Sequence, residues 1–146
     1  MQKIIFLFFL AAVTSLFAQE PMELVFVTTE ANTEIQLPLW GTVDVSVDWG
    51  DESELEFFTT EGNYSHIYSL ADTFTVQISG TLTHFGNWPC FMQSLAQINE
   101  WGELGLTDLS FACCFAENLM HVPDSIPNSV INLSFLFYCA SYFNQD

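Results

Sequence analysis

The chain has 146 residues, of which 50% are hydrophobic, 16% aromatic and only 13% charged. It carries 18 acidic residues against one basic residue, Lys3, which gives a formal net charge of −17. Nucleic-acid binding is excluded, because phosphate backbones are neutralised by Lys and Arg, and so is any catalytic mechanism that needs a lysine or an arginine beyond residue 3. The apolar content is too high for a disordered chain, and the length suits one domain or two small ones.

The N-terminus has the pattern of an export signal. Lys3 precedes the apolar run Ile4–Val13, and the small residue Ala18 lies at a suitable cleavage point. The run is too short to cross a membrane comfortably, and no stop-transfer pattern follows it. We therefore expect a signal peptide over residues 1–18, a secreted or cell-surface protein, and no membrane span after cleavage.

Polar and apolar side chains alternate between residues 22 and 83, which is the period of half-buried strands. Thr42–Trp49 alternates without a fault, and Thr73–Ser79 repeats the pattern; the inward side chains would be Val43, Val45, Val47, Trp49, Phe74, Val76 and Ile78. Shorter strand candidates are Leu24–Thr28, Glu34–Leu39, Leu55–Thr59 and Tyr64–Tyr68. Several short strands separated by turn signals predict a small antiparallel β-sandwich.

A 24-residue repeat replaces the alternation from Trp88 onward. Thr107–Phe111 aligns with Ile131–Phe135 at this offset. A repeat of 20–29 residues with apolar residues at fixed places is typical of a leucine-rich solenoid. Each repeat is expected to hold one short helix and one short strand. The helices would cover Phe111–Ala116 and Phe135–Ala140; the strands would be Leu95–Asn99, Leu119–Pro123 and a segment from Tyr142 onward.

Stacked strands would bring three polar side chains into one surface column. These are Gln97, His121 and Gln145, which are our candidate partner-binding residues. The chain stops within a repeat, whereas a solenoid needs about three repeats and polar ends. We therefore expect a fragment of a longer protein.

The first region resembles the PKD-like domain, an immunoglobulin-like β-sandwich of secreted and surface proteins. The residues that carry the resemblance are Val47–Asp51, Tyr64–Tyr68 and Asp72–Val76, which follow the family order W-G-D-G, H-x-Y and G-x-Y-x-V. The chain departs from this pattern at Glu52 and Asp72, where glycine is usual, and at Phe74, where tyrosine is usual. These departures concern the geometry of turns more than the fold.

The second region resembles the BspA-like leucine-rich repeats of bacterial surface proteins. Trp101–Leu109 and Val130–Asp146 carry this resemblance, and the terminal Phe-Asn-Gln-Asp is its most specific part. Cys139 and Tyr142 stand where the family has small residues. The two resemblances together imply a PKD-like sandwich over residues 19–86 and incomplete repeats over residues 87–146, with adhesion as the implied role.

Candidate chemistry is sparse. Seven of the 18 acidic residues fall between residues 44 and 61, and the candidates for calcium among them are Asp48, Asp51, Glu52 and Glu54. The spacing is not that of an EF-hand, so we favour a solvated acidic turn in which Asp51 bonds its own backbone. His66 is expected to be a packed strand residue. For the four cysteines we favour buried thiols over disulfides.

These observations predict a mainly β protein with short helices, in which an antiparallel β-sandwich is followed by the start of an α/β leucine-rich-repeat solenoid. No catalytic and no cofactor-binding residues are assigned. The expected function is non-catalytic recognition of a protein or glycan partner through the repeat surface. The alternative is an accessory carbohydrate-binding module of a larger exported enzyme, with calcium as its candidate cofactor.

Overall fold

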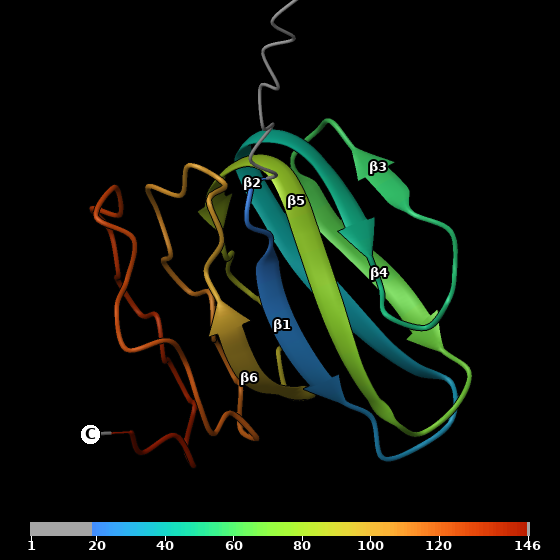
Figure 1. Cartoon of the computed structure of the whole chain (residues 1–146). Coiled ribbons are helices and arrows are strands. Elements are labelled where there is room, and N and C mark those ends of the chain that lie inside the picture. The colour runs from blue at the N-terminus through green and yellow to red at the C-terminus, as the bar shows by residue number, and fades with distance from the viewer. Residues whose placement is uncertain (1–18, 146) are drawn as a thin grey trace, which may run out of the picture.

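The computed structural model describes residues 19–145, so the expected signal peptide lies outside the described residues. Six strands form one antiparallel sheet (Figure 1): β1 (Met22–Val27), β2 (Thr33–Asp48), β3 (Glu56–Phe58), β4 (Gly62–Tyr68), β5 (Thr73–Phe85) and β6 (Leu95–Glu100). Their order is β3-β2-β5-β1-β6, and β4 also pairs with β2. The expected antiparallel β fold of the first region is confirmed.

The long strand β2 gives the sheet two layers. Its first half pairs with β4, from Thr33 opposite Tyr68 to Leu39 opposite Gly62, and its second half pairs with β3 and β5. In Figure 1 the first half passes behind β1 and β5, and the second half lies in front. The register shifts next to Gly41, which has a φ of 73°. Glu34–Leu39 and Thr42–Trp49 are therefore not two strands but one, bent at this glycine.

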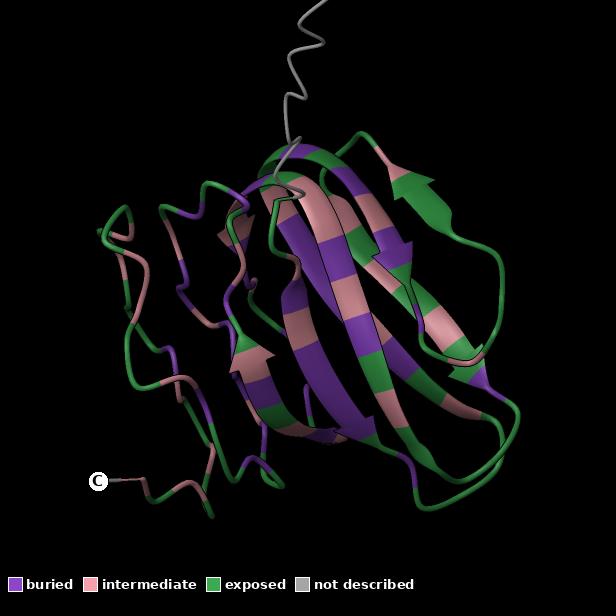
Figure 2. Cartoon of the chain, viewed as in Figure 1, coloured by how far each residue is buried: buried purple, intermediate pink, exposed green. Residues whose placement is uncertain are grey.

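The side chains predicted to face inward fill the space between the layers. Val43, Val45, Val47 and Trp49 are all buried, as are Val76 and Ile78, while Phe74 is half-buried. The alternation is visible as bands of buried and exposed residues along the strands in Figure 2. Burial of one strand face explains why period-two patterning located these strands correctly.

The chain after β5 forms coils that stack beside β6 (Figure 1). Parallel bridges join residues that are 24 apart: His84 with Asp108, Asp108 with Asn132, and Gln97 with His121. Four backbone N–H groups of one coil donate to carbonyl oxygens of the next, in the pairs Leu109–Asn132, Phe111–Ser134, Cys113–Leu136 and Phe115–Tyr138. The sequence offset of 24 is thus the distance along the chain at which successive coils meet.

The expected short helices over Phe111–Ala116 and Phe135–Ala140 are wrong, because residues 19–145 contain no helix. Both segments are turns. Phe111, Phe115, Phe135 and Cys139 have φ values between 56° and 61°, which a right-handed helix does not tolerate. The N–H groups of Phe111 and Phe115 donate to carbonyl oxygens of the next coil, Ser134 and Tyr138, instead of to a carbonyl four residues earlier.

The predicted strand at Leu95–Asn99 is confirmed as β6, whereas Leu119–Pro123 and the segment from Tyr142 are not strands. β6 pairs with β1, so the sheet extends past residue 86. One hydrophobic cluster also runs from Met22 and Trp49 to Leu109, Cys113 and Leu119. In the described part of the chain we find no helix with the length and hydrophobicity that a membrane crossing needs.

Candidate functional site

Six aromatic side chains gather on the surface of the stacked coils. We call them the aromatic cluster: Trp88, Phe91, Phe111, Phe115, Phe135 and Tyr138. Trp88 and Phe91 are each 51% exposed, Phe135 is 60% exposed and Tyr138 is 41% exposed. Contiguous exposed apolar surface of this kind marks interaction sites on folded proteins. The cluster is therefore the leading candidate for a binding surface.

Four of these rings form a closed circuit. The centroids of Trp88 and Phe111 are 5.6 Å apart, and those of Phe111 and Phe135 are 5.0 Å apart. Tyr138 closes the circuit, 5.9 Å from Phe135 and 5.5 Å from Trp88, and stands nearly perpendicular to both. The four rings line an open depression of about 260 Å³, which we call the aromatic pocket.

The 24-residue spacing of the coils builds this pocket. Phe111 and Phe135 occupy equivalent positions, and the N–H of Phe111 donates to the carbonyl of Ser134. Both phenylalanines have left-handed backbones, with φ of 61° and 58°, and their rings stack at 10°. A left-handed conformation costs a bulky residue about 1–2 kcal/mol, so the coil-to-coil hydrogen bonds and packing must offset it.

A polar ladder crosses the same coils. Asn132 Nδ2 donates to Asp108 Oδ2 at 2.9 Å, and the N–H of Ser110 donates to Asp108 Oδ1 at 2.7 Å. His84 Nε2 lies 3.6 Å from Asp108 Oδ1. Burial acts to raise the pKa of Asp108, but the hydrogen bonds from Ser110 and Asn132 and the nearby His84 outweigh it and lower that pKa. Asp108 is thus an ionised carboxylate that links its own coil to His84 of β5 and to Asn132 of the next coil.

The residues predicted to bind a partner lie in two different situations. Gln97 and His121 are exposed and bridged to each other by their backbones. Gln145 uses its side chain on the chain itself: its Oε1 accepts from the N–H of Val122 and its Nε2 donates to the carbonyl of Val122, both at 2.9 Å. The amide of Gln145 therefore joins the end of the described chain to Val122 in the preceding coil.

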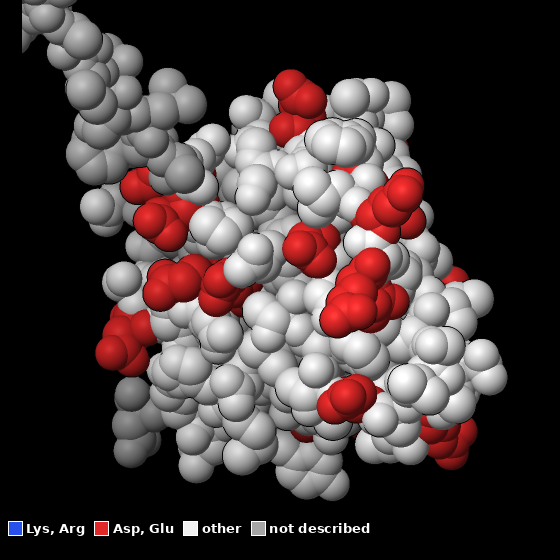
Figure 3. Space-filling view, turned by 45° about the vertical axis from the view of Figure 1, so that its right-hand side comes forward, with Lys and Arg blue, Asp and Glu red and all other residues white. Residues whose placement is uncertain are grey.

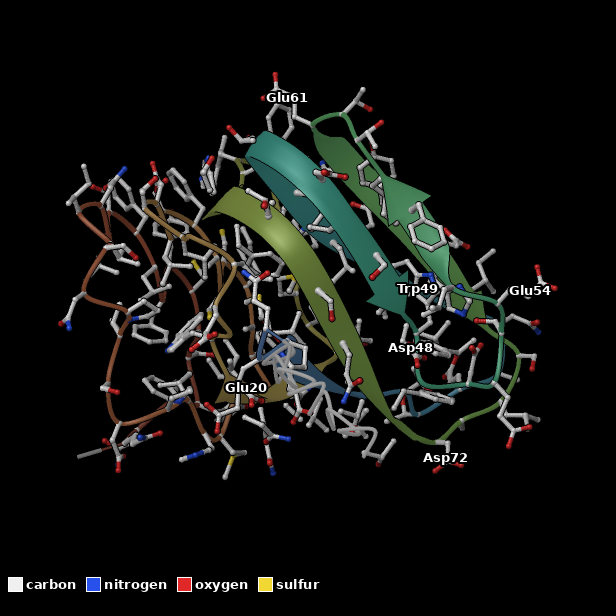
Figure 4. All side chains as sticks on the ribbon, turned by 45° about the horizontal axis from the view of Figure 1, so that its top comes forward. Glu20, Asp48, Trp49, Glu54, Glu61 and Asp72 are labelled. Carbon is white, nitrogen blue, oxygen red and sulfur yellow. The ribbon has the colours of Figure 1, made fainter. Side chains whose placement is uncertain are left out.

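The acidic turn places its calcium candidates apart. Asp48 Oδ1 accepts from the N–H of Gly50, and Asp51 Oδ1 accepts from the N–H of Ser53. Figure 4 shows Glu54 on the outer side of the turn, away from Asp48. Within residues 19–145, no three His, Cys, Asp or Glu side chains are grouped so that they could hold a metal ion. The turn has the backbone-bonding role that the sequence predicts for Asp51.

His66 is the packed strand residue that its position in the sequence predicts. Its ring stacks on Trp49 and meets the edge of Tyr68, and its Nε2 lies 2.8 Å from Asp51 Oδ2. The hydroxyl of Tyr68 donates to the carbonyl of Trp49 at 2.6 Å. Burial raises the pKa of Tyr68, so this hydroxyl stays protonated and acts as a structural donor.

All four cysteines carry free thiols, as favoured from the sequence, but their exposure differs. Cys90, Cys113 and Cys114 are buried, whereas Cys139 is exposed. Burial raises the pKa of Cys90 to about 12 and also raises the pKa of Cys113 and Cys114. Thiols with such pKa values are not thiolates near neutral pH and are poor nucleophiles.

Acidic side chains are spread over the surface rather than gathered at the aromatic pocket. Figure 3 shows them scattered across the visible face without any lysine or arginine between them. The sequence has no basic residue after Lys3, so the side-chain charges of the described residues are those of acids.

Compared with family models, curated proteins and solved structures, the chain matches none.

Sequence reasoning did not find the aromatic cluster. Its rings come from three separate segments, residues 88–91, 111–115 and 135–138. One signal was available: at the 24-residue offset Phe91 aligns with Phe115, and Phe111 aligns with Phe135. Repeated aromatic residues at matching places in stacked coils predict aromatic rows on one surface.

Proposed function

We propose that this chain is a non-catalytic protein of the cell exterior that recognises a partner through the surface of its stacked coils. The observation that carries the proposal is the aromatic cluster, in which four rings are at least 41% exposed. Large aromatic side chains contribute most to recognition when they are held rigidly before the partner arrives. Here the backbone hydrogen bonds from Phe111 to Ser134 and from Phe115 to Tyr138 hold the coil that carries Phe135 and Tyr138.

Three further observations support the proposed location and family. The charged and apolar pattern of residues 1–18 favours export. The proposed BspA-like character is supported by the parallel bridges between residues 24 apart. The proposed PKD-like character is supported by Glu52, which has a φ of 65° at the position where that family has glycine.

The experiment compares two double variants of the chain without residues 1–18. Trp88→Ala with Tyr138→Ala removes two exposed rings of the aromatic cluster. Ile67→Ala with Leu70→Ala is the matched control, because these side chains are 59% and 68% exposed and belong to β4 and the turn after it. Binding is measured on arrays of cell-surface proteins and glycans.

We expect the wild-type and control proteins to bind a shared partner, and the aromatic variant to bind it at least about tenfold more weakly. All three should have melting temperatures within a few degrees of one another, because the changed side chains are exposed. Equal binding by the aromatic variant and the control would show that recognition does not use this surface.

A second candidate function is an accessory carbohydrate-binding module. The exposed ring of Trp88 favours it, since an aromatic face can stack against a sugar ring. The calcium dependence considered for such a module is not favoured, because Asp48 and Asp51 already accept backbone hydrogen bonds. Retention on insoluble polysaccharides, with and without a chelator, tests this candidate: no retention in either condition removes it.

A further inference from the structure

The aromatic pocket is an open depression lined by four rings that contact one another. Neighbouring ring centroids around its circuit are 5.0–5.9 Å apart. A group seated over the centre of such a circuit lies within about 6 Å of the ring centroids, and a cation there is attracted by each ring whose face it meets. Tyr138 stands at 78° to Trp88 and at 79° to Phe135, whereas Phe111 and Phe135 are nearly parallel, so the four rings do not share one plane.

Charge favours a cation from outside the chain. Aromatic surfaces in proteins often hold an arginine or lysine of the same chain, but this chain has no such residue after Lys3. The 18 acidic residues create a negative field that raises the local concentration of cations and repels anions. The nearest acid along the chain is Asp108, three residues before Phe111, and the lowered pKa of Asp108 keeps it ionised.

The lining of the pocket selects among cations. Its four lining residues are all aromatic, and their ring faces offer no hydrogen-bond acceptors comparable to carboxylates. A primary ammonium would lose the water bound to its three N–H donors without replacement, which is costly. A quaternary ammonium has no N–H donor, and its methyl groups pack favourably against aromatic rings.

We propose that the aromatic pocket formed by Trp88, Phe111, Phe135 and Tyr138 binds the trimethylammonium group of a small soluble compound. This inference rests on the proposed function, because it assigns a ligand class to the same aromatic surface. A neutral sugar is the competing ligand for these rings. It fits less well because its hydroxyl groups need polar partners, and the four residues that line the pocket offer few.

The test is a calorimetric titration of the chain without residues 1–18. The probe is choline, and the neutral comparison is 3,3-dimethylbutan-1-ol, which has the same shape with carbon in place of the charged nitrogen. We expect saturable binding of choline, about tenfold or more tighter than that of the neutral alcohol. Glucose oligosaccharides form a third arm.

Variants locate the site. Trp88→Ala should abolish choline binding, and Tyr138→Phe should retain it, because phenylalanine keeps the aromatic ring and removes only the hydroxyl. Phe91→Ala is the matched control: Phe91 is an exposed member of the aromatic cluster but does not line the pocket. It should bind choline like the wild type.

Each other outcome overturns the proposal. Equal affinity for choline and the neutral alcohol would show an apolar pocket without cation selectivity. Binding of oligosaccharides but not choline would assign the rings to sugars. If choline does not bind while partner binding on the arrays still depends on Trp88 and Tyr138, the proposed ligand class is wrong and the proposed function stands. If the protein binds neither choline nor any partner on the arrays, both proposals are wrong.

Discussion

The imidazole of His66 lies nearly parallel to the indole of Trp49, with ring centroids 4.7 Å apart and an angle of 11° between the planes. The same imidazole reaches Asp51, whose other carboxylate oxygen holds the N–H of Ser53. The acidic turn that follows β2 is thereby fixed to β4.

Asp51 should make the stability of the protein depend on pH in the acid range. Burial acts to raise the pKa of Asp51, but hydrogen bonds from Ser53 and His66 and the nearby His66 outweigh it, so the pKa is lowered from 3.8. A carboxylate with a lowered folded-state pKa stabilises the protein above its unfolded-state pKa, and this is lost as pH falls through the folded value. We expect Asp51→Asn to lower the free energy of unfolding by about 1 kcal/mol at pH 7.

Urea denaturation at pH 7 and pH 3 measures this difference, which should shrink at pH 3. Asp44→Asn is the control, because Asp44 is exposed on β2. An equal loss of stability in both variants at pH 7 would contradict the role given to Asp51.

Glycine at position 52 should stabilise the protein. Glu52 has a φ of 65°, a conformation that glycine adopts without strain and that a residue with a Cβ atom pays about 1–2 kcal/mol to adopt. The greater freedom of glycine in the unfolded chain offsets part of the gain. We expect Glu52→Gly to raise the free energy of unfolding by about 0.5–1 kcal/mol, and Glu54→Gly to lower it slightly. Thermal denaturation of both variants measures the difference. If the backbone at position 52 were not strained, Glu52→Gly would lower the melting temperature instead of raising it.

The strain at Phe111 can be separated from the loss of its ring. Phe111→Ala and Phe111→Gly both remove the ring, but only alanine keeps a Cβ atom at a φ of 61°. The glycine variant should be about 1 kcal/mol more stable than the alanine variant. At Phe91, which does not have a positive φ, the order should be reversed. Chemical denaturation of the four variants gives the comparison.

Gly86 should be intolerant of a side chain. Its φ is 135°, and an added Cβ atom would collide with the carbonyl oxygen of Ser110 in the next coil. We expect Gly86→Ala to cost more than about 2 kcal/mol. Gly105→Ala is the matched control, because Gly105 also has a positive φ of 84° but has no atom near its absent Cβ. That variant should lose only about 1 kcal/mol of unfolding free energy, and equal losses would show that the coils are not closely stacked at Gly86.

In the folded protein the exposed thiol of Cys139 should react with a thiol reagent, and the three buried thiols should be protected from it. A disulfide reagent at pH 8 should modify Cys139 rapidly in the folded protein and all four cysteines after denaturation. Cys139→Ser should remove the rapid phase. Fewer than four reactive thiols in the denatured, unreduced protein would instead reveal a disulfide bond.

The sequence predicted the strands where burial of one face imposes alternation, as in Val43, Val45 and Val47. It did not predict that β2 continues through Gly41, because a glycine between two strand patterns reads as a turn as readily as a bend. A helix is expected over Phe111–Ala116 because repeats of this length typically pair a short helix with a short strand. The left-handed backbones of Phe111 and Phe115 depend on hydrogen bonds to a coil more than twenty residues away.

The candidate site was less predictable than the strands. The turn-bonding role of Asp51 follows from local chemistry, which is why it could be inferred. The aromatic pocket depends on which side of each coil faces solvent, and aromatic residues in sequence are expected in the core. Exposure of Trp88 and Phe135 follows only once the coils are stacked.

The coil-to-coil hydrogen bonds of the turn segments also have an electrical consequence. From Leu109 to Phe115, four N–H groups all point toward the following coil, and the carbonyls of that coil point back. Each peptide unit has a dipole of about 3.5 D, and aligned units add as they do in a helix. Within this turn segment the dipoles add, with their positive end toward the coil of residues 132–138, whereas the N–H of Ile131 donates back to Thr107 elsewhere in the same coils. In a protein without lysine or arginine after residue 3, electropositive character there comes from main-chain amides instead of side chains.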